Sequence, residues 1–286
     1  MTPASPPAAP PTPSSPPLVI RPAAVWPSLQ LAEIWEHWDL LRTLASRDVK
    51  LRYRQTALGV SWVVIQPLLA AAVLGFVFGR VAKVSASGTG HFLFAFVGFL
   101  AWSAFTAAAT RSAPSLLQNA TLVSRVYFPR LLLPVAASLS SLLDAAIGLV
   151  VAVVIALWTM GGVPLTVAAA PVFIMLAGLL GAGLGIAGAA LAVSYRDVQH
   201  VLPVFVQLTL FASPVAYPVS AVPAEFRSLY LLNPLAGLID GLRWSLLGGV
   251  PGAWSGVLYA AVTAVACFAA GVYCFRLLDR GFADVI

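Results

Sequence analysis

The chain has 286 residues, of which 60% are hydrophobic and only 9% are charged, and its formal net charge is +6. A soluble globular domain carries about 25% charged residues, so this composition excludes an ordinary soluble domain and favours a protein with several membrane spans. The basic excess indicates membrane topology and not nucleic-acid binding, because most Lys and Arg residues lie between hydrophobic runs.

The N-terminal segment is rich in proline. Its first 22 residues hold nine prolines, together with Ala, Ser and Thr. Proline lacks a backbone donor and interrupts both helix and sheet, so we predict a disordered cytoplasmic tail over residues 1–27. A docking segment is the alternative interpretation. The transmembrane domain is expected to occupy residues 28–286.

An amphipathic helix is predicted for residues 28–45. Its apolar residues follow helical spacing and form one stripe: Leu31, Ile34, Trp35, Trp38, Leu41 and Ala45. Two tryptophans on that stripe favour a helix that lies on the membrane surface. A helix packed against a partner protein is the alternative.

A basic cluster follows and leads into the first span. Arg47, Lys50, Arg52 and Arg54 lie within eight positions, and residues 55–79 carry no charge. About 20 apolar residues suffice to cross a bilayer as a helix, and a basic cluster at the entrance marks the cytoplasmic side. We therefore predict a first span over residues 59–79 that starts in the cytoplasm.

The remaining hydrophobic runs predict an all-α integral membrane protein with six transmembrane helices. The later spans are expected at 92–110, 131–160, most of 165–193, 201–219 and 254–275. Residues 223–252 are apolar but interrupted by charges and by Asn233-Pro234. This segment fits two short re-entrant helices better than a span, with the corner at Pro234, because proline disfavours helical geometry in the residue before it. Arg227 and Arg243 are expected to anchor this hairpin near the headgroups.

The distribution of basic residues predicts that both termini are cytoplasmic. With six spans, the inner segments hold twelve of the 16 Lys and Arg residues and the outer segments hold the other four. An excess of Lys and Arg marks the cytoplasmic loops. A seven-span arrangement would leave the final basic residues, Arg276 and Arg280, outside.

Residues that support enzyme chemistry are missing from the sequence. Neither lysine, Lys50 or Lys83, follows a glycine, so no Walker-type phosphate loop exists. The three histidines are isolated and show no metal-ligand spacing. We expect no enzyme, no cofactor and no metal on this chain. If ATP drives transport, ATP and Mg²⁺ are expected on a partner.

Asp144 is the one acidic residue deep within a predicted span. A charge there costs about 2.5–3.5 kcal/mol on insertion scales, so an intramembrane carboxylate is by default a functional candidate. A hydrogen bond to Ser138, Ser140 or Ser141, or a watery crevice, are the structural alternatives. The aromatic residues are expected to form interfacial belts or, in part, to line a path.

Several local motifs together resemble ABC-2-type export permeases for polysaccharides. The resemblance extends over about residues 30–280, in order and at plausible spacing. It is carried by residues 47–56 with Leu58, Gly59, Trp62, Gln66 and Pro67, by Asn119, Leu122, Val123 and residues 126–130, by residues 195–198 with 213–215, Tyr217 and Pro218, and by residues 233–235 with Arg243.

The resemblance implies a homodimeric channel in the inner membrane, two separate ATPase subunits and a glycan on a polyprenyl-diphosphate carrier, such as O-antigen, capsule or teichoic acid. The ATPase-coupling residues it implies are Gln118, Asn119, Leu122, Val123, Arg125, Tyr127, Phe128, Pro129, Arg130, Tyr195, Arg196 and Asp197. Residues assigned to substrate entrance or path are Arg47, Lys50, Arg52, Arg54, Trp62, Trp102, Phe105, Phe211 and Tyr217. Asn233, Pro234 and Arg243 belong to the expected outer gate.

Two other functions compete with glycan export. One is a related permease that exports a drug or a small lipid. The other is a membrane-embedded transferase acting on lipid-linked sugar, which would need catalytic acids or histidines clustered near one interface. For the four basic residues 47, 50, 52 and 54, attraction of a diphosphate headgroup competes with the simpler role of setting topology next to anionic lipid.

Overall fold

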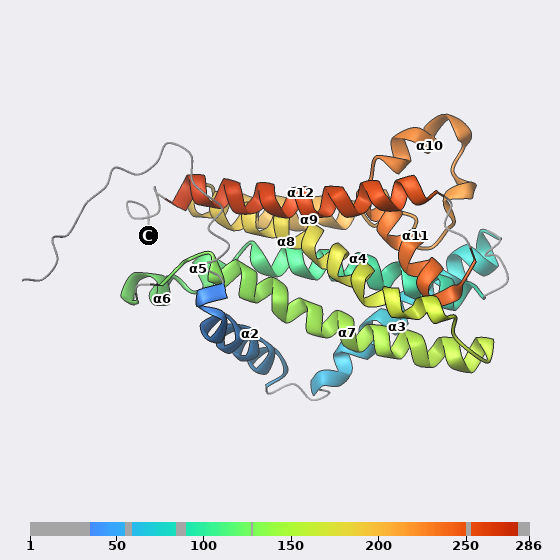
Figure 1. Cartoon of the computed structure of the whole chain (residues 1–286), viewed down its shortest axis with the longest axis horizontal. Coiled ribbons are helices and arrows are strands. Elements are labelled where there is room, and N and C mark those ends of the chain that lie inside the picture. Colours follow the sequence, from blue (N-terminus) through green and yellow to red (C-terminus); the bar gives the residue numbers. More distant parts are fainter. Residues whose placement is uncertain (1–34, 55–58, 84–89, 127, 250–252, 280–286) are drawn as a thin grey trace, which may run out of the picture.

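Long apolar helices dominate the structure, a computed structural model that describes residues 35–54, 59–83, 90–126, 128–249 and 253–279. These ranges contain helices and no strand (Figure 1). Five helical segments are long and apolar enough to cross a membrane: Trp62–Val81, His91–Ser112, Leu132–Met160, Leu165–Ser194 and Trp254–Leu278. They coincide with five of the six predicted spans. The all-α membrane class is thus confirmed, and the tail 1–27 lies outside the described residues.

The α-helices are numbered along the chain as in Figure 1. Their bounds are α2 Trp38–Tyr53, α3 Trp62–Phe76, α4 His91–Ser112, α5 Ser115–Gln118, α6 Ala120–Arg125, α7 Leu132–Met160, α8 Ala170–Ser194, α9 Val198–Leu208, α10 Ala224–Leu231, α11 Pro234–Leu247 and α12 Trp254–Leu278. A π-helical turn over Val77–Val81 extends α3. At the end of α7, Gly161 adopts a left-handed conformation with φ 73°, which makes the predicted turn after residue 160.

The span expected at residues 201–219 differs from the prediction. Its helix, α9, ends at Leu208 and covers 11 residues, or about 16 Å, which is shorter than a bilayer core. Turns follow, up to Tyr217. The segment still runs alongside α4. At one end, Leu202 of α9 lies with Ala113 against Gly188 of α8, and at the other end the Tyr217 ring packs at a tilt against that of Phe78, near the start of α4. The described residues therefore contain five helical segments of membrane length and one shorter apolar helix, α9.

The N-terminal helix α2 extends further than its amphipathic pattern predicts. It continues through the basic cluster to Tyr53, with Lys50 and Arg52 in its last turn. Leu41, Leu44 and Ala45 are buried, against α7 and the adjacent loop, and Trp38 is half exposed. The interface helix is therefore attached to the bundle along one face, and it includes Arg47, Lys50 and Arg52 of the basic cluster, whereas Arg54 follows its end.

Residues 223–252 contain the two short helices that the sequence predicts, α10 and α11. Asn233 lies at their corner, where its side chain accepts a hydrogen bond from the Leu235 amide at 3.0 Å and so caps α11. The expected role of Arg243 as a headgroup anchor is wrong. Its side chain is only 6% exposed, its guanidinium lies 3.5 Å from the centre of the Phe94 ring, and it donates to the Val215 carbonyl at 2.7 Å. Desolvation inside the protein is offset by these contacts.

Small residues permit close packing between the central helices. Helix α8 packs against α4 on one side and α12 on another. A Cβ atom added to Gly271 of α12 would collide with the backbone oxygen of Gly183 of α8, and one added to Gly181 would collide with that of Phe105. In a bilayer, such contacts replace the hydrophobic effect as the force between helices. By contrast, α3 packs only partly against the core, with few fully buried residues, and leaves one apolar face uncovered.

We predict that Gly271→Ala destabilises the bundle. The added methyl group would force α8 and α12 apart, at a cost of about 1–3 kcal/mol in the free energy of unfolding. Gly256→Ala on the same helix is the matched control, because a Cβ atom there meets nothing within 4 Å. Detergent-titrated unfolding measures both. Equal effects of the two variants would contradict the close packing described.

Candidate functional site

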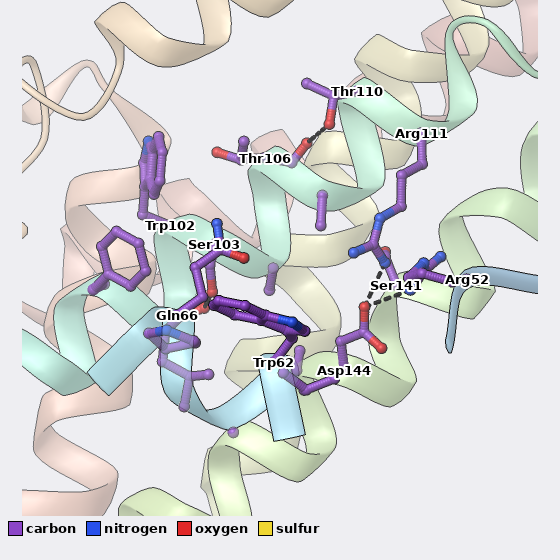
Figure 2. Close-up of a pocket in the computed structure, with 18 of the residues that line it drawn as sticks. Arg52, Trp62, Gln66, Trp102, Ser103, Thr106, Thr110, Arg111, Ser141 and Asp144 are labelled. Atoms are coloured by element: carbon purple, nitrogen blue, oxygen red, sulfur yellow. Dashed lines mark hydrogen bonds and ion pairs between the residues drawn. The ribbon is translucent and has the colours of Figure 1, made fainter. Parts of the chain in front are cut away.

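Asp144 of α7 binds two arginines from two other helices. Arg52 Nη1 donates to Asp144 Oδ2 at 2.5 Å, and Arg111 Nη1 donates to the same oxygen at 2.6 Å. The Tyr53 hydroxyl donates to Asp144 Oδ1 at 2.7 Å. We call Arg52, Arg111 and Asp144 the ion triad. In Figure 2 the two guanidiniums converge on the carboxylate from different helices.

Local helical geometry positions each member of the ion triad. Arg52 and Tyr53 occupy the last turn of α2, and Arg111 is the penultimate residue of α4. Ser140 and Asp144 are four residues apart on α7 and therefore lie on one face. Arg52 Nη2 donates to Ser140 Oγ at 3.0 Å, while the Ser140 hydroxyl donates to the Ala137 carbonyl. Asp144 bonds to two cations and a phenol and not to Ser138, Ser140 or Ser141, and it also lines a cavity, as the crevice alternative expects.

The electrostatics of the ion triad are unbalanced. Two guanidiniums share one carboxylate, so the group carries one excess positive charge. The side chains are 26% (Arg52), 31% (Arg111) and 15% (Asp144) exposed, so each keeps some access from outside. Burial raises the pKa of Tyr53, and its hydrogen bond to Asp144 raises that pKa further, so the phenol remains a donor at neutral pH.

A cavity of about 480 Å³ opens beside the ion triad, between α3, α4 and α7. Trp62, Gln66 and Trp102 form part of its wall, and Arg52, Arg111 and Asp144 lie at one end (Figure 2). Ser103, Thr106 and Thr110 also line it. The cavity thus combines a cationic end with aromatic and hydroxyl-bearing walls.

A second cavity, of about 440 Å³, lies on the other side of the ion triad. It is lined by residues of α2, of the end of α4 and of the α5 region, including Asp48, Gln118 and Asn119. Arg52, Thr110 and Arg111 line both cavities. We call this one the inner cavity and the first one the aromatic cavity. The two arginines therefore form part of the partition between them.

The structure brings together three of the nine residues predicted for the substrate path. Arg52, Trp62 and Trp102 line the aromatic cavity. Phe105 is buried in the core instead, because it lies on the face of α4 that packs against α8. Phe211 and Tyr217 lie elsewhere, and the Tyr217 hydroxyl is 2.7 Å from that of Tyr230 on α10. Lys50 and Arg54 are exposed.

The predicted coupling residues form an exposed rim with a buried underside. Gln118, Arg125, Tyr195, Arg196 and Asp197 are exposed. On the underside, Val123 is buried, Leu122 and Phe128 pack against the core, and Tyr127 lies outside the described residues.

Helix α2 and the last helix both contact the coupling region. Arg47 Nη2 donates to Asn119 Oδ1 at 2.9 Å, which links α2 to the start of α6. Arg130 pairs with Asp279 at 3.2 Å.

Sequence reasoning missed Arg111, Tyr53 and Gln66. In the sequence, Arg111 counts only as one of the twelve inner basic residues that indicate topology, although it lies at the end of the span next to that of Asp144. A lone intramembrane carboxylate usually has a cationic partner, and this rule would have pointed to the arginines at the span ends. Within the described ranges, no group of three or more His, Cys, Asp or Glu residues suits a metal ion.

Comparisons with known proteins agree with this architecture. The family description "ABC-2 type transporter" matches residues 39–247. The O-antigen export system permease protein RfbA of Klebsiella pneumoniae is 26% identical over 87% of this chain and 95% of its own length. The protein of the same name from Myxococcus xanthus is 30% identical over 74% of this chain and 81% of its own length. The polysialic acid transport protein KpsM of Escherichia coli is 21% identical over 73% and 81%.

We predict that Arg52 and Asp144 are energetically coupled. In a double-mutant cycle with Arg52→Gln and Asp144→Asn, the coupling free energy should be about 1–3 kcal/mol, between the values for exposed and for buried ion pairs. The control cycle uses Arg130→Gln and Asp279→Asn, a longer pair at 3.2 Å, and should give less than about 1 kcal/mol. Unfolding titrations in mixed micelles measure both. Additive effects of Arg52→Gln and Asp144→Asn would contradict the pairing.

Proposed function

Because the chain belongs to the ABC-2 type transporter family, we propose that it is the channel-forming subunit of an ABC exporter that carries a lipid-linked polysaccharide, such as O-antigen, across the inner membrane. It is a membrane subunit and not an enzyme. ATP is hydrolysed by a separate subunit that holds the nucleotide and Mg²⁺. Both termini are cytoplasmic in this proposal.

The lining of the aromatic cavity is the main support for a polysaccharide as the substrate class. Sugar rings stack on aromatic faces, and polar side chains hold them by exchangeable hydrogen bonds, so the 47% exposed Trp62 and its hydroxyl-bearing neighbours suit a chain of sugars that must slide. The cationic end suits the phosphate groups of a lipid carrier. The names of the relatives, two O-antigen export permeases and a polysialic acid transport protein, support the same class.

Assembly with partners is supported by two surfaces. Helix α3 borders the aromatic cavity and presents an uncovered apolar face, which suits a second copy of the chain completing the channel. At the expected inner end, exposed polar residues of α6 and of the α8–α9 turn suit an ATPase on each protomer. The bond from Arg47 to Asn119 would convey movement of this rim to α2.

The alternatives have less support. A permease for a drug or small lipid would share the fold but has no need of a cationic end between two cavities. A transferase would need clustered acids or histidines. In the described part of the chain, Asp144 is the acid of the aromatic cavity, and it is already bonded to two arginines.

We predict that α6 faces the cytoplasm and the α7–α8 turn faces the opposite side. In a variant with Cys267 and Cys274 replaced by alanine, Ser124→Cys should react with an impermeant maleimide only after spheroplasts are opened. Gly162→Cys should react in intact spheroplasts, since a Cβ atom there meets nothing within 4 Å. Labelling of Ser124→Cys from outside would contradict the proposed topology.

Deleting the gene should abolish surface polysaccharide and leave lipid-linked glycan inside the cell. Trp62→Ala should restore about two- to tenfold less surface polysaccharide than the wild type, the loss of one aromatic contact. Trp62→Phe should restore nearly all of it. Trp158→Ala is the matched control, because Trp158 is 92% exposed and lies outside the cavity. Unchanged surface polysaccharide in the deletion strain would contradict the proposed function.

A further inference from the structure

The ion triad has the composition of an anion-binding site, which we call the seat. In this structure the carboxylate of Asp144 occupies the position of the anion. We propose that Arg52 and Arg111 bind a phosphate-bearing anion, and that Asp144 is the resident counterion that this anion displaces. The anion is the headgroup of a lipid diphosphate. That identification rests on the proposed function, whereas the seat itself rests on the geometry of the ion triad.

Unused hydrogen-bonding capacity supports the seat. A guanidinium has five N–H donors. Among the described residues, Arg52 uses donors on Asp144 and Ser140, and Arg111 donates to Asp144 alone. Both arginines converge on one oxygen atom, Asp144 Oδ2, so their charged ends lie close together and are incompletely neutralised. A phosphate group, with several acceptor oxygens and a larger charge, would satisfy both guanidiniums better than one carboxylate oxygen.

The position of the two arginines gives an anion access. Because Arg52 and Arg111 line both cavities, an anion in the inner cavity meets the guanidiniums before it reaches the tryptophans. Sugars linked to such a headgroup would then lie next to Trp62 and Trp102 (Figure 2). The order of groups, cationic and then aromatic, matches the order of groups in a diphosphate-linked glycan.

Displacement of Asp144 would also change how α2 is held. The Arg52–Asp144 and Tyr53–Asp144 bonds fasten the end of α2 to α7, and Arg47 fastens its middle to Asn119 at the coupling rim. An anion that replaces Asp144 as the partner of Arg52 breaks the Arg52–Asp144 ion pair and so removes one of the contacts between α2 and α7. Binding at the seat would thereby favour a conformation in which α2 and, through Arg47, the rim are displaced. The size of this population shift equals the difference in the anion's binding free energy between the two conformations.

The test uses the full chain in nanodiscs of phosphatidylcholine, whose headgroup has no net charge. The probes are farnesyl diphosphate, farnesol and inorganic pyrophosphate, and thermophoresis gives each Kd. Farnesyl diphosphate should bind at least about tenfold more tightly than farnesol. Arg52→Gln and Arg111→Gln should each weaken its binding by about tenfold or more, as expected for a lost charge-assisted hydrogen bond.

The Asp144→Asn variant distinguishes most clearly between a displaced counterion and a purely structural carboxylate. It removes the competing charge but keeps the shape, so the variant should bind farnesyl diphosphate about tenfold more tightly than the wild type, although its fold is weakened. A purely structural Asp144 would give the opposite result. Arg42→Gln is the matched control, because Arg42 is an exposed arginine of α2 outside both cavities, and it should bind as the wild type does.

Weaker binding in Asp144→Asn, or unchanged binding in both arginine variants, would overturn the proposal. If Asp144→Asn does not fold, the arginine variants and the farnesol comparison still decide. Pyrophosphate that binds as tightly as farnesyl diphosphate would assign the seat to free phosphates instead of a lipid headgroup. These measurements need neither ATPase nor glycan, so failure of export in cells and failure of the seat are separate results.

Discussion

The bonds made by Asp144 join the three parts of this protein that must work together. One carboxylate on α7 holds the N-terminal helix α2, through Arg52 and Tyr53, and the central helix α4, through Arg111. A lone charge inside a membrane protein is costly, and pairing it is the condition for keeping it there. Because two arginines share it, the pairing is incomplete, and the remaining positive charge lies where the inner and aromatic cavities meet.

Packing around the ion triad determines what can move. Helices α4, α8 and α12 approach each other through glycines such as Gly183 and Gly271, where added atoms would meet backbone, so this part of the bundle is rigid. Helix α3 is different, since it borders the aromatic cavity and also leaves apolar side chains such as Leu69 and Val73 uncovered. The proposed channel is thus closed on its rigid side by α4 and α7 and open on the side where a second copy would lie.

Hydropathy and charge predicted most of the fold, because the length of an apolar run and the basic residues beside it are local properties of the sequence. The span at 201–219 was predicted wrongly as one helix, since a hydropathy window does not register that the helix ends at Leu208 and that turns continue from there to Tyr217. The site was predicted only in part. Arg52, Trp62 and Asp144 were named separately, but their meeting with Arg111 depends on how α2, α4 and α7 pack, which no single segment encodes. Arg243 was misplaced for the same reason.

The most direct test of the ion triad as an anion seat is an experimental structure of the chain in nanodiscs, solved with and without a polyprenyl diphosphate. The account predicts phosphate density between the guanidiniums of Arg52 and Arg111, with Asp144 left to Tyr53, and the sugar-bearing end directed toward Trp62. Headgroup density elsewhere, with Arg52 and Arg111 still bonded to Asp144, would contradict it.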